Sequence, residues 1–322
     1  MSKTTKYSLL LLLTAAIWGF AFVAQSAGGD AVGPFSFNAV RSLIGAGVLL
    51  PVIALLDRMG YGKKPATKAE KKRLWKAGCS IGVVLFLATN LQQLGITYGR
   101  SAGKAGFLTA CYLILVPVLG LFLGKKCGIH VWGAVVVALC GIWLLSMTEV
   151  SGLEWPDIML LGSALSFAVQ ILLIDHFVAD LDGIRMSAIQ FLTCGLLSLI
   201  PMVLTETGQS AAAAGAWLAA FGAPAAWISI LYAGLFSCGV AYTLQIVGQK
   251  NVPPTLASLM MSFESVFCVL GGWLLLGERM SGRQIRGCVF VFAAILLAQF
   301  GEVLRGAGAR KRKKEEQSEA LS

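Results

Sequence analysis

Two charged side chains lie inside apolar stretches of this chain, and they are its best candidates for chemistry. Glu264 interrupts the run VPPTLASLMMSFESVFCVLGGWLLLGER, and Arg41 lies within FNAVRSLIGAG. A charged group in a membrane interior costs about 2.5–3.5 kcal/mol on insertion scales, so it is rarely kept without a partner or a task. A carboxylate and a guanidinium that face one cavity could form an ion pair, which would greatly reduce this cost.

The expected depths of the two residues are similar. With the N-terminus of the chain in the cytoplasm, Glu264 is about ten residues, or roughly 15 Å, from the cytoplasmic start of its run. Arg41 is about seven residues, or roughly 10 Å, from the outer start of its own run. In a hydrocarbon core about 30 Å thick, their axial separation is on the order of 5 Å. A pair would form a gate or a substrate-sensitive switch. The alternatives are a fixed ion pair that sets helix packing, or an Arg41 that extends outward while Glu264 is protonated.

Proton coupling through Glu264 is a further expectation. Burial disfavours the charged form of a carboxyl group, whereas a nearby guanidinium favours it. The balance between the two effects would make the charge on Glu264 sensitive to its surroundings.

Other polar and aromatic side chains in the apolar runs are candidates for lining a pathway. Trp18 lies about 16 Å into its run, too deep for an interfacial belt, and could form a wall or a cation–π surface, with helix packing as the alternative. Asn38, one turn before Arg41, could hydrogen-bond the guanidinium or a substrate. Gln92 and Gln245 are expected as matching amides at the two mouths of one pathway, although interhelical hydrogen bonding would also explain them. The weaker candidates are Tyr112, Gln170 and Tyr242.

The composition indicates that these elements lie in a membrane and not in water. Of the 322 residues, 57% are hydrophobic and 13% are charged, and the mean hydropathy is +0.77. These values predict an all-α integral membrane protein, in which each span needs roughly 20 apolar residues. Ten transmembrane helices are expected at Tyr7–Ala27, Pro34–Leu56, Ala77–Thr97, Lys104–Leu123, Ile129–Met147, Trp155–Asp175, Ile184–Leu204, Trp227–Val247, Pro254–Leu276 and Ser281–Val303.

Basic residues predict the orientation of these helices. Most of the 26 Lys and Arg residues share one side of the membrane when the N-terminus is inside, above all those in Arg58–Lys76 and Arg305–Lys314. By the positive-inside rule, we expect a multi-pass protein of the plasma membrane with both termini in the cytoplasm. The net charge of +10 then reflects topology and attraction to anionic lipids, and nucleic acid is not an expected partner. A cleaved signal peptide is disfavoured because the first run exceeds the usual 7–15 residues.

An internal repeat divides the chain. At an offset of about 153 residues, Gln92 aligns with Gln245 and Cys111 with Glu264, and Pro51 aligns with Pro201 at a slightly smaller offset. Residues 1–150 and 151–304 each form a five-span unit, and 305–322 form a basic cytoplasmic tail that is expected to be disordered. Because five is odd, the second unit enters the membrane from the opposite side, which gives an inverted-topology repeat of the kind that builds secondary transporters. Chance similarity between apolar helices is the alternative.

Three segments carry a resemblance to a known family: AAIWGFAFVAQ, GKAGFLTACYLILVPVLGLFLGKK and AYTLQIVGQKNVPPTLASLMMSFESVFCVLGGWLLLGERMS. They resemble the EamA-type branch of the drug/metabolite transporter superfamily, from about Leu9 to Gln299. The resemblance implies an exporter or carrier of small metabolites, often amino acids or related compounds, with a cavity lined by the first four helices of each repeat. Many relatives have Pro where this chain has Ser265, which places the kink of that helix in question, whereas Pro117 could bend its first-half counterpart.

These observations favour a secondary transporter that works by alternating access. No phosphate-binding loop, CxxC pair or metal-ligand spacing is found, so we expect no cofactor and transport driven by gradients of substrate, proton or another ion. The expected partners are a small-molecule substrate, membrane lipids and a coupling ion, with a homodimer left open. A channel or a structural scaffold is the alternative. A membrane-embedded enzyme is less favoured, because Asp175 and His176 lie at a boundary without an obvious partner.

Overall fold

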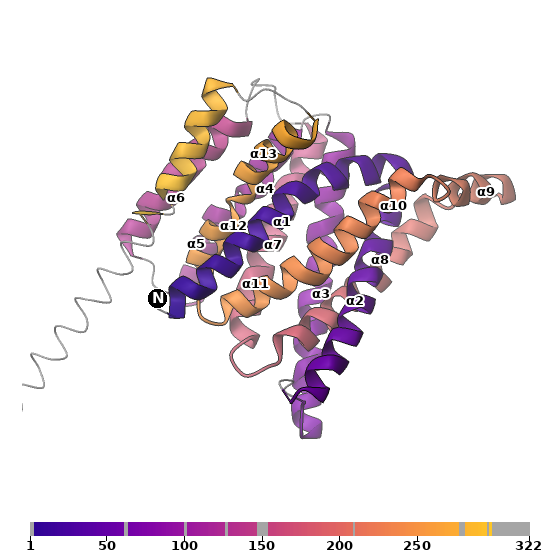
Figure 1. The fold of residues 1–322 in the computed structure, drawn as a ribbon, viewed down its shortest axis with the longest axis horizontal. Coiled ribbons are helices and arrows are strands. Elements are labelled where there is room, and N and C mark those ends of the chain that lie inside the picture. The colour runs from indigo at the N-terminus through magenta and orange to yellow at the C-terminus, as the bar shows by residue number, and fades with distance from the viewer. Residues whose placement is uncertain are drawn as a thin grey trace, which may run out of the picture.

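The computed structural model describes residues 3–60, 64–99, 102–125, 128–146, 154–208, 210–276, 281–294 and 296–297. Every regular element within these residues is a helix (Figure 1). The predicted tail at 305–322 and the C-terminal part of the last predicted span lie outside the described residues.

The described helices divide between the two halves of the chain. The first half contains α1 (Lys3–Val32), α2 (Pro34–Arg58), α3 (Lys68–Tyr98), α4 (Ala102–Ala110), α5 (Tyr112–Phe122) and α6 (Ile129–Ser146). The second half contains α7 (Trp155–Phe177), α8 (Gly183–Thr205), α9 (Ala211–Ala220), α10 (Pro224–Leu231), the π-helix η1 (Tyr232–Ala241), α11 (Tyr242–Gln249), α12 (Pro254–Met261) and α13 (Glu264–Leu276). Residues 282–294 are also helical.

In the described part of the chain, 7 helices are long and apolar enough to cross a membrane. They coincide with the first four predicted spans and with the sixth, seventh and eighth. Residues Ile129–Leu144 form a shorter apolar helix, the predicted span Pro254–Leu276 is divided between α12 and α13, and the last predicted span is only partly described. Large hydrophobic side chains such as Phe122 and Ile129 point outward, 84% and 86% exposed, as expected for a surface that lipid covers. The protein is therefore a multi-pass membrane protein.

Helices α2 and α8 pack against each other in antiparallel orientation. Near the end of α2, the Asp57 carboxylate accepts a hydrogen bond from Arg185 at the start of α8. Just beyond the end of α8, the Glu206 carboxylate accepts hydrogen bonds from the backbone N–H groups of Phe35 and Ser36 at 2.8 and 2.7 Å, in the first turn of α2. Each helix thus ends in an acidic residue that holds the beginning of the other, where the helix dipole favours negative charge.

Corresponding contacts recur in the two halves. Thr14 of α1 donates a hydrogen bond to the Ala241 carbonyl of η1 at 3.2 Å, and Ser163 of α7 donates one to the Ala88 carbonyl of α3 at 2.8 Å. The donors Thr14 and Ser163 occupy corresponding positions in the two repeats to within about one residue. The acceptors Ala88 and Ala241 are separated by 153 residues, the offset at which the two halves align. The internal repeat is thus also present in the side-chain contacts.

Two predicted spans are broken at positions that correspond in the repeat to within about two residues. The break between α4 and α5 lies at Cys111, whose thiol donates to the Phe107 carbonyl, and the break between α12 and α13 lies at Ser262, whose hydroxyl donates to the Leu259 carbonyl. Such side-chain hydrogen bonds to the preceding turn compete with the helical backbone and bend helices. The interruption before Glu264 therefore forms with Ser265, and not a proline, after the glutamate, and Pro117 lies inside α5 rather than at the first-half break.

Candidate functional site

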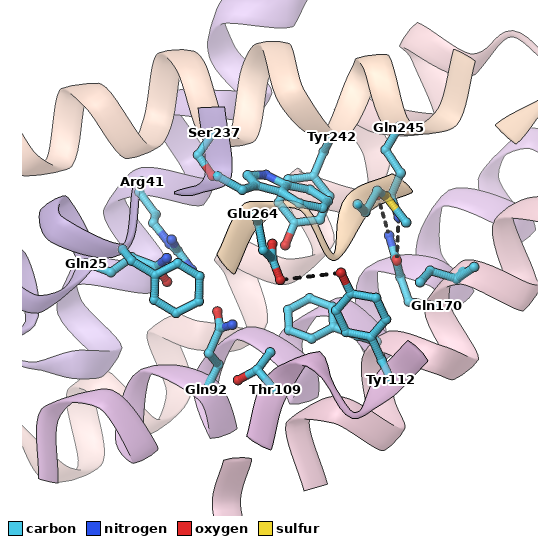
Figure 2. Close-up of a pocket in the computed structure, with 15 residues that line it drawn as sticks. Gln25, Arg41, Gln92, Thr109, Tyr112, Gln170, Ser237, Tyr242, Gln245 and Glu264 are labelled. Carbon is cyan, nitrogen blue, oxygen red and sulfur yellow. Dashed lines mark hydrogen bonds between the residues drawn. The ribbon is translucent and has the colours of Figure 1, made fainter. Parts of the chain in front are cut away.

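A central cavity lies between the two halves (Figure 2). The cavity has a volume of about 30 Å³, enough for one or two water molecules, so the halves enclose it tightly in this conformation. The first half lines it with Trp18, Phe22 and Gln25 of α1, Arg41 of α2, Gln92 of α3, Thr109 of α4 and Tyr112 of α5. The second half lines it with Phe167, Gln170 and Ile171 of α7, Ser237 of η1, Tyr242 and Gln245 of α11, Met261 of α12 and Glu264 of α13.

Most of the residues that the sequence singled out lie on this cavity. They are Glu264, Arg41, Trp18, Gln92, Gln245, Tyr112, Gln170 and Tyr242. They come from both halves of the chain, so the cavity forms only when the halves are packed together.

Glu264 reaches the cavity from a helix break. It is the first residue of α13, and its side chain is only 6% exposed. The Tyr112 hydroxyl donates a hydrogen bond to its Oε1 atom at 3.4 Å, and this contact crosses from the second half to the first (Figure 2).

Arg41 is buried on the same cavity, and none of the described residues forms an ion pair with it. Its side chain is 3% exposed, and its Nε atom has no hydrogen-bond partner. Its guanidinium carbon lies 5.2 Å from the centre of the Phe37 ring. Within the part of the chain that the structure describes, no ion pair joins Arg41 to Glu264. In Figure 2 Arg41 enters from the left, whereas Glu264 is turned toward Tyr112 on the lower right.

Asn38 does not lie on the cavity. Its Nδ2 atom donates hydrogen bonds to the Thr89 carbonyl at 3.0 Å and to the Asn90 Oδ1 atom at 3.1 Å. The expected contact with Arg41 or a substrate is therefore replaced by a link between α2 and α3.

Aromatic rings form one wall of the cavity. The rings of Trp18 and Tyr242 are 4.6 Å apart between centroids at an interplanar angle of 59°, and Phe191 packs edge-on against Tyr242 at 5.0 Å. The indole Nε1 atom of Trp18 is buried without a hydrogen-bond partner. This wall can contact an apolar ligand group, and an acceptor on that ligand could reach the indole.

The amides lie on one cavity and not at two separate mouths. Gln170 and Gln245 exchange two hydrogen bonds, at 3.3 and 3.1 Å, between α7 and α11 (Figure 2). Gln92 lines the same cavity from α3. The positions of Gln92 and Gln245 along their spans predict opposite ends of a pathway, but the packing of the two halves brings both side chains to one cavity.

The π-helix η1 directs two side chains toward the cavity. The Tyr242 backbone N–H donates to the Ser237 carbonyl, five residues earlier, as in π-helical hydrogen bonding. Ser237 and Tyr242 therefore lie on similar faces of this segment, and both line the cavity. Short π-helical segments are frequent at functional sites.

Sequence reasoning missed part of the lining. The missed residues are Phe22, Gln25, Thr109, Phe167, Ile171, Ser237 and Met261. Helical periodicity could have found some of them, since Trp18, Phe22 and Gln25 follow the i, i+4, i+7 spacing of one helix face. The hydroxyl residues carry no comparable signal, because Ser and Thr also occur in apolar helices as packing residues.

The two halves also contact each other away from the cavity. Lys125, after α5, forms an ion pair with Asp175 near the end of α7. Asp175 is close in sequence to the start of α8, whereas the Glu206 contact with α2 lies at the other end of α8. Polar links between the halves therefore occur toward both ends of the helix bundle, with the cavity between them.

The chemistry available at the cavity is non-covalent binding. It combines a guanidinium, a carboxyl group, amides and aromatic rings, the groups that contact the charged and apolar parts of a small molecule. In the described residues, no group of three or more His, Cys, Asp or Glu side chains is arranged to hold a metal ion.

Comparison with known proteins gives consistent results. The family described as the EamA-like transporter family matches residues 5–147 and 154–300. The chain is 26% identical over 288 residues to an uncharacterized transporter of Archaeoglobus fulgidus, with 89% of this chain and 83% of that protein covered. It is 25% identical over 304 residues to the uncharacterized transporter YoaV of Bacillus subtilis, with 92% of this chain and 97% of that protein covered.

A solved crystal structure has a similar fold. It superposes with a TM-score of 0.73 at 17% sequence identity, and the match covers 91% of this chain and 98% of that chain. At this identity the similarity concerns the fold alone.

Proposed function

The chain belongs to the EamA-like transporter family, and we propose that it is a secondary transporter that moves small metabolites, such as amino acids or related compounds, across the plasma membrane by alternating access. Export is the proposed direction. The observation that carries the proposal is the cavity between the two halves, which presents a buried cation and a buried carboxyl group that are not bonded to each other.

The arrangement of the halves supports an inverted-topology repeat. Helices α2 and α8 occupy corresponding positions in the repeat, and their end contacts show that they run antiparallel. If each half spans the membrane in the same way, the two halves have opposite orientations in it, as in many secondary transporters. We propose the repeats as 1–150 and 151–304, ten membrane helices in all, and both termini in the cytoplasm.

Alternating access requires contacts between the halves that can open at one end at a time. The Lys125–Asp175 ion pair joins the halves at the end that we assign to the cytoplasm, and both side chains are partly exposed to solvent. A partly exposed ion pair is worth little net free energy, so it can open without a large barrier. The cavity would then be reached from the cytoplasm between α5 and α7.

Counterflow in proteoliposomes tests the proposal. Vesicles that contain the full chain are preloaded with an unlabelled candidate metabolite, and uptake of the same labelled compound is followed. We expect saturable uptake that increases with the internal concentration, because a carrier returns loaded faster than empty. The candidates are amino acids, nucleosides and organic cations, first selected by thermal stabilisation of the purified protein.

A channel is the alternative from a different class, and the same vesicles distinguish it. Flux through a channel would be driven by the gradient alone, without stimulation by substrate on the opposite side. Absence of flux for the whole panel would contradict both classes and favour a scaffold.

A further inference from the structure

Arg41 is a buried cation to which the described part of the chain supplies no anion. The ionisable side chains that interact with it are Cys194, Cys238 and Tyr242, each of which is ordinarily neutral at pH 7. Glu264 lines the same cavity but accepts its hydrogen bond from Tyr112. The protein thus keeps an expensive charge next to an empty space without neutralising it.

The contacts of Arg41 leave its hydrogen-bonding capacity unused. A guanidinium carries five N–H donors, and a phenyl ring such as that of Phe37 offers its face but no lone pair. The Nε atom is buried without an acceptor. Gln25, on the same cavity, has a buried amide oxygen that accepts no hydrogen bond, so this neutral acceptor does not pair with Arg41 either.

We propose that Arg41 forms an anion subsite that holds a carboxylate group of the transported molecule. The inference rests on the proposed function and deepens it by naming the group that is recognised. A planar carboxylate matches the guanidinium fork through two parallel hydrogen bonds and would supply the missing counterion. The bound carboxylate would lie at the end of the cavity where Arg41 and Gln25 are seen in Figure 2.

The remainder of the cavity favours a singly charged organic acid over inorganic phosphate. Glu264 lines the same space, and a doubly charged anion would lie close to a second buried acidic group. The rings of Trp18, Phe22 and Tyr242 offer apolar surface that only an organic ligand would use. The expected ligand is therefore a small carboxylic acid with an apolar or aromatic body. The halves must move apart to admit it, because the cavity in this conformation has a volume of only about 30 Å³.

A set of probes that differ in charge tests the subsite. Thermal stabilisation of the purified full-length protein is measured with 3-phenylpropionate, phenylalanine, phenylalaninamide and phenylethylamine, together with aliphatic carboxylates and inorganic phosphate. We expect saturable stabilisation by at least one carboxylate and an affinity weaker by roughly 30-fold or more for its uncharged or cationic analogue. Equal binding of the acid and its amide, preference for phosphate, or no binding by any carboxylate would each overturn the proposal.

Substitutions separate ligand recognition from folding. R41M should lose the preference for the carboxylate, and the ligand-free protein should unfold at a higher temperature, because an unpaired buried charge is replaced by an apolar side chain of similar length. R41K retains the charge but not the fork, so it should bind the acid more weakly than the unaltered protein does. A purely structural Arg41 predicts the opposite: a lower unfolding temperature for R41M, with the charge preference unchanged.

Arg283 supplies a matched control. Its guanidinium carbon lies 4.7 Å from the centre of the Trp143 ring, a geometry similar to that of Arg41 and Phe37, but it does not line the cavity. R283Q should leave carboxylate binding unchanged, and loss of binding in this variant would overturn the assignment to Arg41.

The failure of this inference is distinguishable from that of the proposed function. Binding in detergent requires no transport, so carboxylate binding without counterflow would retain the subsite and reject the carrier. Counterflow of compounds without a carboxylate, unaffected by R41M, would retain the carrier and reject the subsite.

Discussion

Glu264 and Tyr112 connect the two halves of the protein at their helix breaks. Glu264 begins α13, and Tyr112 begins α5, directly after the residue that corresponds to Glu264 in the repeat. The Tyr112 hydroxyl therefore donates a hydrogen bond to the Glu264 carboxyl group across the cavity. The carboxyl group exists only in the second half, since its counterpart is Cys111. A near-symmetric scaffold thus carries an asymmetric carboxyl group at its centre.

Replacement of Glu264 tests proton coupling at the residue scale. E264Q keeps the shape of the side chain and its capacity to accept from Tyr112, but it cannot take up or release a proton. If Glu264 carries the proton, the variant should still perform counterflow and should lose the stimulation of flux by an imposed pH gradient. Flux in proteoliposomes with and without the gradient measures this difference.

An exposed acidic residue provides the control for this experiment. Asp30 lies in α1 with an exposed side chain, and D30N changes the formal charge of the protein by the same amount as E264Q. D30N should respond to the pH gradient as the unaltered protein does. A full response in E264Q as well would remove Glu264 from proton coupling.

At the scale of the elements, the helices approach closely where glycines replace larger side chains. A Cβ atom at Gly82 of α3 would lie 2.6 Å from the Thr193 Cβ atom and 2.7 Å from the Gln190 carbonyl oxygen, both in α8. Gly234 of η1 meets α2 in the corresponding way, with the Ile44 Cβ atom at 3.0 Å. In a membrane, small residues at such contacts allow the close packing that holds helices together.

A glycine pair tests this packing. G82A should destabilise the protein by about 1–3 kcal/mol, because the added methyl group meets backbone and a Cβ atom that cannot move aside. Gly47 in α2 has no atom within 4 Å of an added Cβ, so G47A should be neutral or stabilising by up to about 1 kcal/mol. Thermal unfolding of the two variants in the same detergent compares them, and equal unfolding temperatures would contradict the close packing.

At the scale of the whole molecule, the cavity depends on both halves. Residues of α1 to α5 line it from the first half, and residues of α7, η1, α11, α12 and α13 line it from the second half. The largest cluster of buried hydrophobic side chains likewise includes residues of both halves, among them Leu113 and Phe191. The halves therefore share one core, and movement of one half against the other would change access to the cavity.

Cysteine labelling tests the proposed orientation of the whole molecule. In a chain whose native cysteines are replaced, A212C in α9 and A69C in the first turn of α3 each introduce one thiol at an exposed position. With both termini in the cytoplasm, a membrane-impermeant maleimide added to intact cells should label A212C and not A69C. Both should react after the membrane is opened, and the reverse pattern in intact cells would invert the topology.

The membrane environment, the helical class, the repeat and most of the polar cavity residues could be predicted from the sequence alone. Hydrocarbon offers no hydrogen bonds, so each apolar run must satisfy its own backbone, and helices follow from composition alone. For the same reason, side chains such as Gln170 and Glu264 must face protein or a cavity wherever they occur in an apolar run.

Only the tertiary structure decided which of these side chains meet. Counting residues placed Arg41 and Glu264 at similar depth, but depth says nothing of rotation about the helix axis or of lateral distance. The break at Ser262 and the packing of α13 direct Glu264 to Tyr112, Asn38 turns to α3, and Arg41 is left facing the cavity without a counterion. These outcomes depend on contacts between helices that are far apart in the chain, and no local pattern of residues contains them.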